Sequence, residues 1–122
     1  MFRRVSNMEN DSDIAFRYLF IDLAIKNLEL DQQHVKHGAF KIKEPYIEWI
    51  EKMISKAIKE RRQLKKIMYQ RKIEILLLHR QGDFSTYKVV SNRGEKQVTL
   101  INHMIKKNVG EIIKELIGLG IY

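Results

Sequence analysis

Residues 45–72 decide the fold, and their sequence is PYIEWIEKMISKAIKERRQLKKIMYQRK. Projected at about 100° per residue, the apolar side chains of this segment fall on one side of a helix. Pro45 suits the first helical turn, where a missing N–H leaves no hydrogen bond unmade. The segment therefore predicts a long amphipathic helix whose apolar side enters the core, formed by Ile47, Ile50, Met53, Ile54, Ala57, Ile58, Leu64 and Met68.

Positive charge is concentrated in the same helix. Between Lys52 and Lys72 there are nine basic residues and one acid, Glu60. The rest of the chain holds 14 basic and 14 acidic residues, so this segment accounts for the whole formal net charge of +8. Because the apolar side must be buried, five of the bases are predicted to point into solvent: Lys52, Lys56, Lys59, Arg62 and Lys66.

This basic face has two interpretations, and the sequence leaves both open. Glu44, Glu48 and Glu51 precede the bases, which is the order that the helix dipole favours in any solvated surface helix. The second interpretation is an anionic partner, because phosphates or anionic headgroups gain Coulomb energy and release counterions at clustered cations. Arg71 and Lys72 favour the partner, because helix stability gives no reason to add two further cations without accompanying acids.

The first helix is predicted to run from about Ser12 to Leu30, with Asp11 or Ser12 as its N-cap. Its apolar residues point almost all round the axis, which is typical of a helix at the centre of a core or under a second subunit. Burial inside one protomer and a share in a homodimer interface both fit this pattern. A short helical turn within residues 31–43 is predicted to end at Gly38.

From about residue 72 onward the apolar period changes from helical to extended. Turn signals at Gln81-Gly82-Asp83 and Asn92-Arg93-Gly94 divide the chain that follows into three strands, the second over 84–91 and the third over 95–100. A last helix is predicted over roughly 102–117, ending at Gly118, with a buried stripe of Ile105, Val109, Ile112, Ile113 and Leu116. The predicted fold class is α+β, with two N-terminal helices, a three-stranded antiparallel meander and a C-terminal helix.

A length of 122 residues suits a single domain over 1–122. The chain has no cysteine, so it can form neither disulfides nor thiolate metal sites, which fits a reducing interior. It also lacks an apolar segment long enough for a signal peptide or a spanning helix. We therefore expect a cytoplasmic protein, and abundant Lys and Ile indicate an AT-rich bacterial or phage genome.

No pattern in the sequence favours an enzyme, a metal site or a cofactor. The six glycines are scattered rather than gathered in a phosphate-binding loop. Asp31, His34 and His37 bring only two side chains onto one helical face, so an exposed polar turn is the preferred interpretation over a metal site. His79 and His103 are single histidines, which are interpreted as surface or capping residues.

One catalytic alternative stays open, because small RNA-cleaving toxins can act with few residues and little sequence signature. Its candidates are His79, Arg80, Tyr87 and Lys88.

We expect a non-catalytic nucleic-acid-binding protein, such as a phage or mobile-element regulator, that contacts the phosphates of DNA or RNA through the basic helix. Base readout is expected only from Arg62 and Gln63, so affinity should be weakly specific and strongly reduced by salt. The predicted contact residues are Lys52, Lys56, Lys59, Arg61, Arg62, Lys65, Lys66, Arg71 and Lys72.

The alternative function is a protein–protein interaction module that binds an acidic partner without nucleic acid. Trp49 or Tyr69 would then be the exposed aromatic anchor. Apolar residues around Trp49 would favour a protein partner, whereas isolated bases on a polar ridge would favour phosphate. Membrane attachment is not expected, because the apolar side of the helix would have to leave the core to enter lipid.

Overall fold

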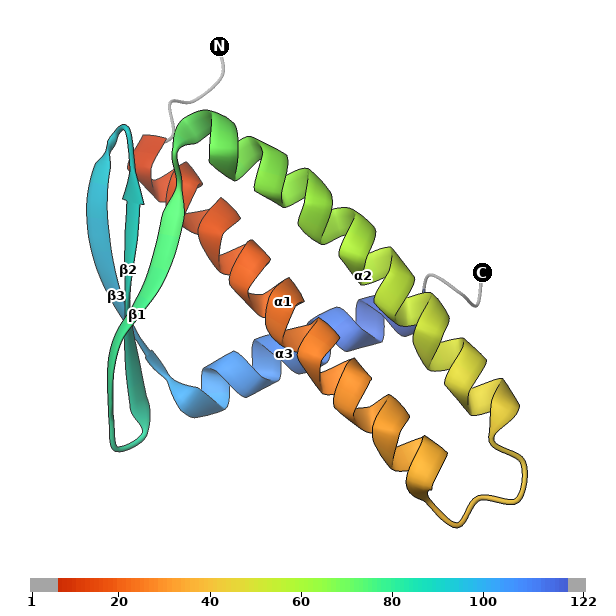
Figure 1. Cartoon of the computed structure of the whole chain (residues 1–122). Coiled ribbons are helices and arrows are strands. Elements are labelled where there is room, and N and C mark those ends of the chain that lie inside the picture. Colours follow the sequence, from red (N-terminus) through yellow and green to blue (C-terminus); the bar gives the residue numbers. More distant parts are fainter. Residues whose placement is uncertain (1–6, 119–122) are drawn as a thin grey trace.

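A computed structural model describes residues 7–118 of the chain (Figure 1). It contains a long helical hairpin, a three-stranded antiparallel sheet and a last helix, so the predicted α+β fold class is confirmed. The elements are α1 (Asn7–His37), α2 (Glu44–Arg71), β1 (Glu74–Gln81), β2 (Phe84–Ser91), β3 (Gly94–Ile101) and α3 (Asn102–Gly118).

Helix α1 is longer than predicted at both ends. The N-cap prediction is wrong, because Asp11 and Ser12 lie inside the helix and are buried. The helical turn expected within residues 31–43 ends just before Gly38 as predicted, but it is the last part of α1 rather than a separate element. Gly38 is required for close approach: a Cβ there would lie 2.8 Å from the carbonyl oxygen of His34 and 2.9 Å from the ring of Phe40.

The end of α2 sets the direction of the sheet. Lys72 has φ 55° and ψ 40°, the left-handed conformation that usually follows a helix end. Its N–H donates to the carbonyl oxygen of Tyr69 at 3.3 Å, and the N–H of Ile73 donates to that of Met68 at 2.8 Å. Met68 and Ile73 also pack in one buried cluster. This Schellman arrangement turns the chain sharply from α2 into β1.

The sheet has the strand order β1-β2-β3, and both pairs are antiparallel. Both turns are in the predicted places: Gly82, with φ 59°, lies in the first, and Gly94, with φ 140°, begins β3 directly after the second. Tyr87 and Val89 lie on the face of β2 that is turned toward α1, because the Tyr87 ring meets that of Phe16 edge-on, with 5.8 Å between centroids. The opposite face carries the Thr86 hydroxyl, hydrogen-bonded to Thr99 at 2.9 Å.

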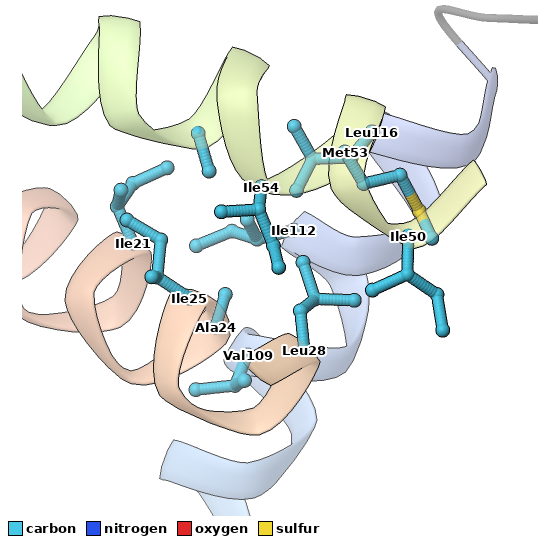
Figure 2. Close-up of a cluster of buried hydrophobic side chains, with 11 residues drawn as sticks. Ile21, Ala24, Ile25, Leu28, Ile50, Met53, Ile54, Val109, Ile112 and Leu116 are labelled. Carbon is cyan, nitrogen blue, oxygen red and sulfur yellow. The ribbon is translucent and has the colours of Figure 1, made fainter. Parts of the chain in front are cut away.

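The larger core cluster lies where the three helices meet (Figure 2). Its buried side chains come from all three helices, and they include four residues of the predicted α2 stripe and three of the predicted α3 stripe. The members are Ile21, Ala24, Ile25, Leu28, Ile50, Met53, Ile54, Ala57, Val109, Ile112 and Leu116. Four apolar residues of α1 are therefore buried within one protomer, while Leu30 of the same helix stays exposed.

A smaller cluster attaches the sheet to the helices. It consists of Ala15 from α1, Met68 from α2, Ile73 after the turn and Val89 from β2. Helix α1 packs against α2, α3 and all three strands, so it is the central element of the fold.

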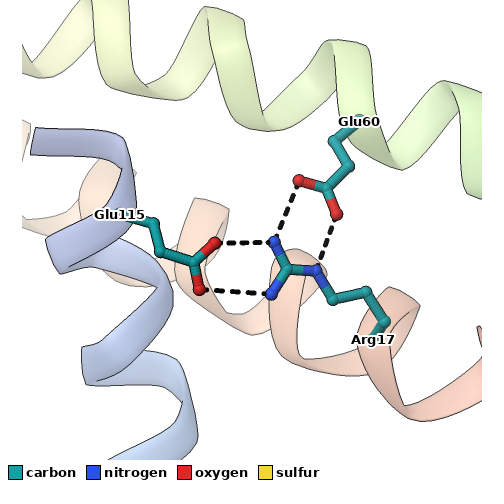
Figure 3. A network of polar contacts seen from close by, with 3 residues as sticks. All are labelled: Arg17, Glu60 and Glu115. Atoms are coloured by element: carbon teal, nitrogen blue, oxygen red, sulfur yellow. Dashed lines mark hydrogen bonds and ion pairs between the residues drawn. The ribbon is translucent and has the colours of Figure 1, made fainter. Parts of the chain in front are cut away.

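Arg17 of α1 joins the three helices through carboxylates (Figure 3). Its Nε and Nη2 donate to Glu60 of α2 at 2.6 and 3.1 Å, and Nη2 and Nη1 donate to Glu115 of α3 at 3.1 and 3.5 Å. The hydrogen bond with Glu60 raises the pKa of Arg17 above its usual value, against the opposing effect of partial burial, and Glu115 adds to the rise. The one acid within the basic segment is thus engaged by α1.

Candidate nucleic-acid interface

The nine predicted contact residues divide into two groups in the structure. Two of them form ion pairs with acids of α1: Arg61 donates to Asp22 at 2.7 Å, and Arg71 donates to Asp11 at 3.2 Å. The prediction that Arg71 lacks an accompanying acid is therefore wrong. Its acid is distant in sequence and is brought close by the packing of α1 on α2.

The other seven form no ion pair with any acid in residues 7–118. Six of them are exposed, and Lys56 is half-buried. The five bases predicted to point outward all belong to this group. We call the group the basic surface, which consists of Lys52, Lys56, Lys59, Arg62, Lys65, Lys66 and Lys72.

A groove of about 890 Å³ borders one side of the basic surface. Most of its lining residues come from the end of α2 and the start of β1, two elements that diverge from the turn at Lys72 (Figure 1). One wall carries Arg62, Lys65 and Lys66, while apolar side chains provide most of the remaining lining. The residues around the groove are Tyr18, Arg62, Lys65, Lys66, Met68, Tyr69, Gln70, Ile73, Glu74, Ile75 and Leu76.

Tyr69 stands out in this groove because 87% of its surface is exposed. On the helix it lies three residues after Lys66 and four after Lys65, so its ring is a direct neighbour of both cations. No ring contact involves it among the residues that the structure describes. The groove therefore presents an unstacked aromatic ring beside unpaired positive charge.

A second exposed surface lies at the turn between α1 and α2. Phe40, Ile42, Tyr46 and Trp49 are all exposed there, and we call them the α1–α2 tip. The rings of Phe40 and Tyr46 lie 6.0 Å apart between centroids, and Trp49 follows Tyr46 by one helical turn. Trp49, which is 46% exposed, thus has the aromatic Tyr46 one turn before it and the base Lys52 one turn after it.

The sequence candidates for catalysis do not converge. Tyr87 is buried on the face of the sheet toward α1, and Arg80 shares that face because it pairs with Ser85. His79 pairs with Thr86 on the opposite face, where Lys88 forms an ion pair with Glu95 at 3.6 Å. The four side chains therefore point to two different sides of the sheet.

The remaining histidines lie apart from the groove on exposed positions: His34 and His37 near the end of α1, with Asp31, and His103 in the first turn of α3. Within residues 7–118, no group of three or more His, Asp or Glu side chains is placed to hold a metal ion. No helix in the same range is both long and apolar enough to cross a bilayer.

Sequence reasoning found the cations of the groove but missed its other walls. Tyr18 comes from α1, and Ile73, Ile75 and Leu76 come from the start of the sheet. The local signal that could have found the groove was Tyr69, an aromatic residue one turn after two lysines on the polar side of an amphipathic helix.

Comparison with known proteins places the chain in a family. A family model described as YhjD protein matches residues 6–120. The protein named Uncharacterized protein YhjD from Bacillus subtilis (strain 168) is 28% identical over 101 residues, which are 83% of this chain and 84% of that protein. No solved structure gives a significant match. Because the family model spans almost the whole chain, this protein belongs to the YhjD protein family.

Proposed function

We propose that this protein binds nucleic acid without catalysis, through the basic surface of α2. The observation that carries the proposal is the set of seven cations that no acid in residues 7–118 neutralises. Because α2 is packed on its apolar side, the backbone that carries six of these cations is held in place, and Lys72 follows directly after the helix. Such an array can contact successive phosphates at little further cost in backbone entropy.

The expected mode of binding is electrostatic. Each lysine that contacts a phosphate releases condensed counterions, so affinity should fall steeply as salt rises. Arg62 and Gln63 are exposed on the same face and are the side chains suited to contact base edges. Because only these two side chains are suited to base contacts, we expect little preference among nucleic-acid sequences. A regulator of a phage or mobile element is one setting for this activity.

The test is fluorescence polarisation with labelled DNA and RNA at two salt concentrations. The triple variant Lys56→Glu, Lys59→Glu, Arg62→Glu should reduce affinity at low salt by at least about 100-fold, because three attractive contacts become repulsive. The matched control changes Lys96, Lys106 and Lys107 to Glu; these lysines are exposed outside α2, and the net charge falls equally. Equal behaviour of the two variants would mean that only overall charge matters, and the proposal would fail.

A second candidate function is supported by the α1–α2 tip. Four exposed apolar side chains at the end of a helical hairpin are typical of a protein-binding surface, and the adjoining cations of α2 suit an acidic partner. Trp49 is the one tryptophan of the chain, so its fluorescence reports on this surface directly. Titration with an acidic amphipathic peptide should shift its emission to shorter wavelength under this alternative, while nucleic acid should not.

A homodimer through α1 remains a prediction. The burial of its apolar residues within one protomer leaves Leu30 as its one exposed large hydrophobic side chain in the described range. Light scattering on the purified protein would decide between monomer and dimer.

A further inference from the structure

The groove between α2 and β1 has two features that phosphate binding alone does not require, an apolar lining and an exposed aromatic ring. A ridge that holds duplex phosphates requires cations, but it has no use for an apolar floor or an exposed ring. This groove has both, with Met68 and Ile73 among its apolar lining and the Tyr69 ring beside Lys65 and Lys66. The combination is suited to a ligand that is flat and apolar in one part and anionic in another.

We infer that this groove binds single-stranded nucleic acid, with an unpaired base stacked on Tyr69 and the adjoining phosphates held by Arg62, Lys65 and Lys66. The inference deepens the proposed function and depends on it. Bases in a duplex are stacked inside the helix and cannot place a face on a protein ring. A single strand exposes those faces, and every base has one, so stacking adds affinity without sequence preference.

The spacing on α2 supports this arrangement. Arg62 precedes Lys65 and Lys66 by one helical turn, and these precede Tyr69 by another, so the four side chains follow the groove wall in order. The two turns span about 10 Å along the helix axis. Three cations for phosphates are thus followed by one stacking ring along the same wall, and proteins that bind single strands combine these two kinds of group.

Glu74 provides an internal check, because it is the one acid among the residues that line the groove. A phosphate in the groove must approach its carboxylate, so the charge of Glu74 opposes binding. The variant Glu74→Gln removes the charge with little change of shape. This variant should raise the affinity for a single strand severalfold. The affinity for a ligand held only on the basic surface outside the groove should change far less.

The experiment compares a labelled single strand of about ten nucleotides, as oligothymidine and as oligouridine, with a duplex of the same length by fluorescence polarisation. The wild-type chain should bind a single strand more tightly than the duplex. Tyr69→Ala should weaken single-strand binding about tenfold and leave duplex binding almost unchanged, because it removes only the stacking surface. Tyr69→Phe, which keeps the ring, should retain the affinity.

Tyr46→Ala is the matched control, since Tyr46 is an exposed tyrosine of the same helix that lies outside the groove. It should change neither affinity. If the duplex binds as tightly as the single strands, or if Tyr69→Ala weakens both alike, the inference is overturned while the proposed function stands. If no nucleic acid binds the wild-type chain, the proposed function fails and the inference fails with it.

Discussion

Lys72 shows how one residue can combine a structural cost with a useful charge. It is the one non-glycine residue with positive φ in the described chain, and it belongs to the basic surface. A side chain in the left-handed conformation costs about 1–2 kcal/mol. A glycine there would avoid the cost and would also remove one cation from the basic surface.

The variant Lys72→Gly is therefore expected to stabilise the protein and weaken its binding. Relief of the left-handed strain exceeds the extra chain entropy of glycine, so the net gain should be about 0.5–1 kcal/mol. Urea denaturation measures it as a higher midpoint at unchanged slope. Gln63→Gly, within α2, is the control and should destabilise by about 1 kcal/mol. A loss of stability in Lys72→Gly would contradict this account of the turn.

Arg17 is the second residue whose contacts lead to a prediction. Its guanidinium makes paired hydrogen bonds with Glu60, but both side chains are about one-third exposed, so solvent screening reduces the benefit. A double-mutant cycle of Arg17→Gln and Glu60→Gln should give a coupling energy of about 1 kcal/mol. A coupling energy near zero would mean that the Arg17–Glu60 pair adds no stability beyond that of the helix packing.

The pH dependence of the Arg17 contribution follows from the raised pKa. A group whose pKa is higher in the folded state stabilises fully below its unfolded value and loses the effect only as pH rises through the folded value. The pKa of arginine in the unfolded chain already lies well above the range in which protein stability is usually measured. The stability difference between wild type and Arg17→Gln should therefore stay constant from about pH 6 to about pH 10, measured by urea denaturation across that range. A decline within that range would contradict it.

At the scale of elements, the boundaries of α1 show what the sequence could not reveal. Asp11 is a residue type that is common at helix N-caps, yet its side chain is only 1% exposed and pairs with Arg71 at the far end of α2. Local patterns predicted every helix and strand, because the spacing of apolar residues that distinguishes a helix from a strand involves only residues close together in sequence. The pairing of Asp11 with Arg71 joins distant positions, and no local pattern contains it.

This pair predicts how firmly α1 is held against the end of α2. Arg71→Leu would leave the carboxylate of Asp11 buried without its cation, and the Oδ2 atom already has no hydrogen-bond partner in the described structure. We expect a loss of about 2–3 kcal/mol in the free energy of unfolding. The double variant Asp11→Leu, Arg71→Leu should recover most of it. Lys66→Leu, which removes an unpaired exposed cation, should change stability by less than about 0.5 kcal/mol.

At the scale of the whole molecule, the candidate interface was partly predictable. The cations could be read from the sequence, because an amphipathic helix with one buried side must expose the other. The sequence could not show which of these cations are paired with acids, since Asp11 and Asp22 reach Arg71 and Arg61 only through the packing of α1 on α2. The groove was equally hidden, because its lining combines Tyr18 with the start of β1. That residues 1–122 form a single domain also remains a prediction.

The two core clusters differ in size, and this difference predicts how the molecule opens. The three helices share the larger cluster, whereas the sheet is held mainly by four buried residues that include Val89. Val89→Ala should remove about 2 kcal/mol, chiefly from the attachment of the sheet. Native-state hydrogen exchange should then show faster exchange in β2, while amides of α1 and α2 near Ile25 keep more of their protection. Ile25→Val, in the larger cluster, is the control and should lower protection in all elements together. Equal loss in sheet and helices for Val89→Ala would mean that the two clusters unfold as one unit, and in that case the groove between α2 and β1 could open only with the whole molecule.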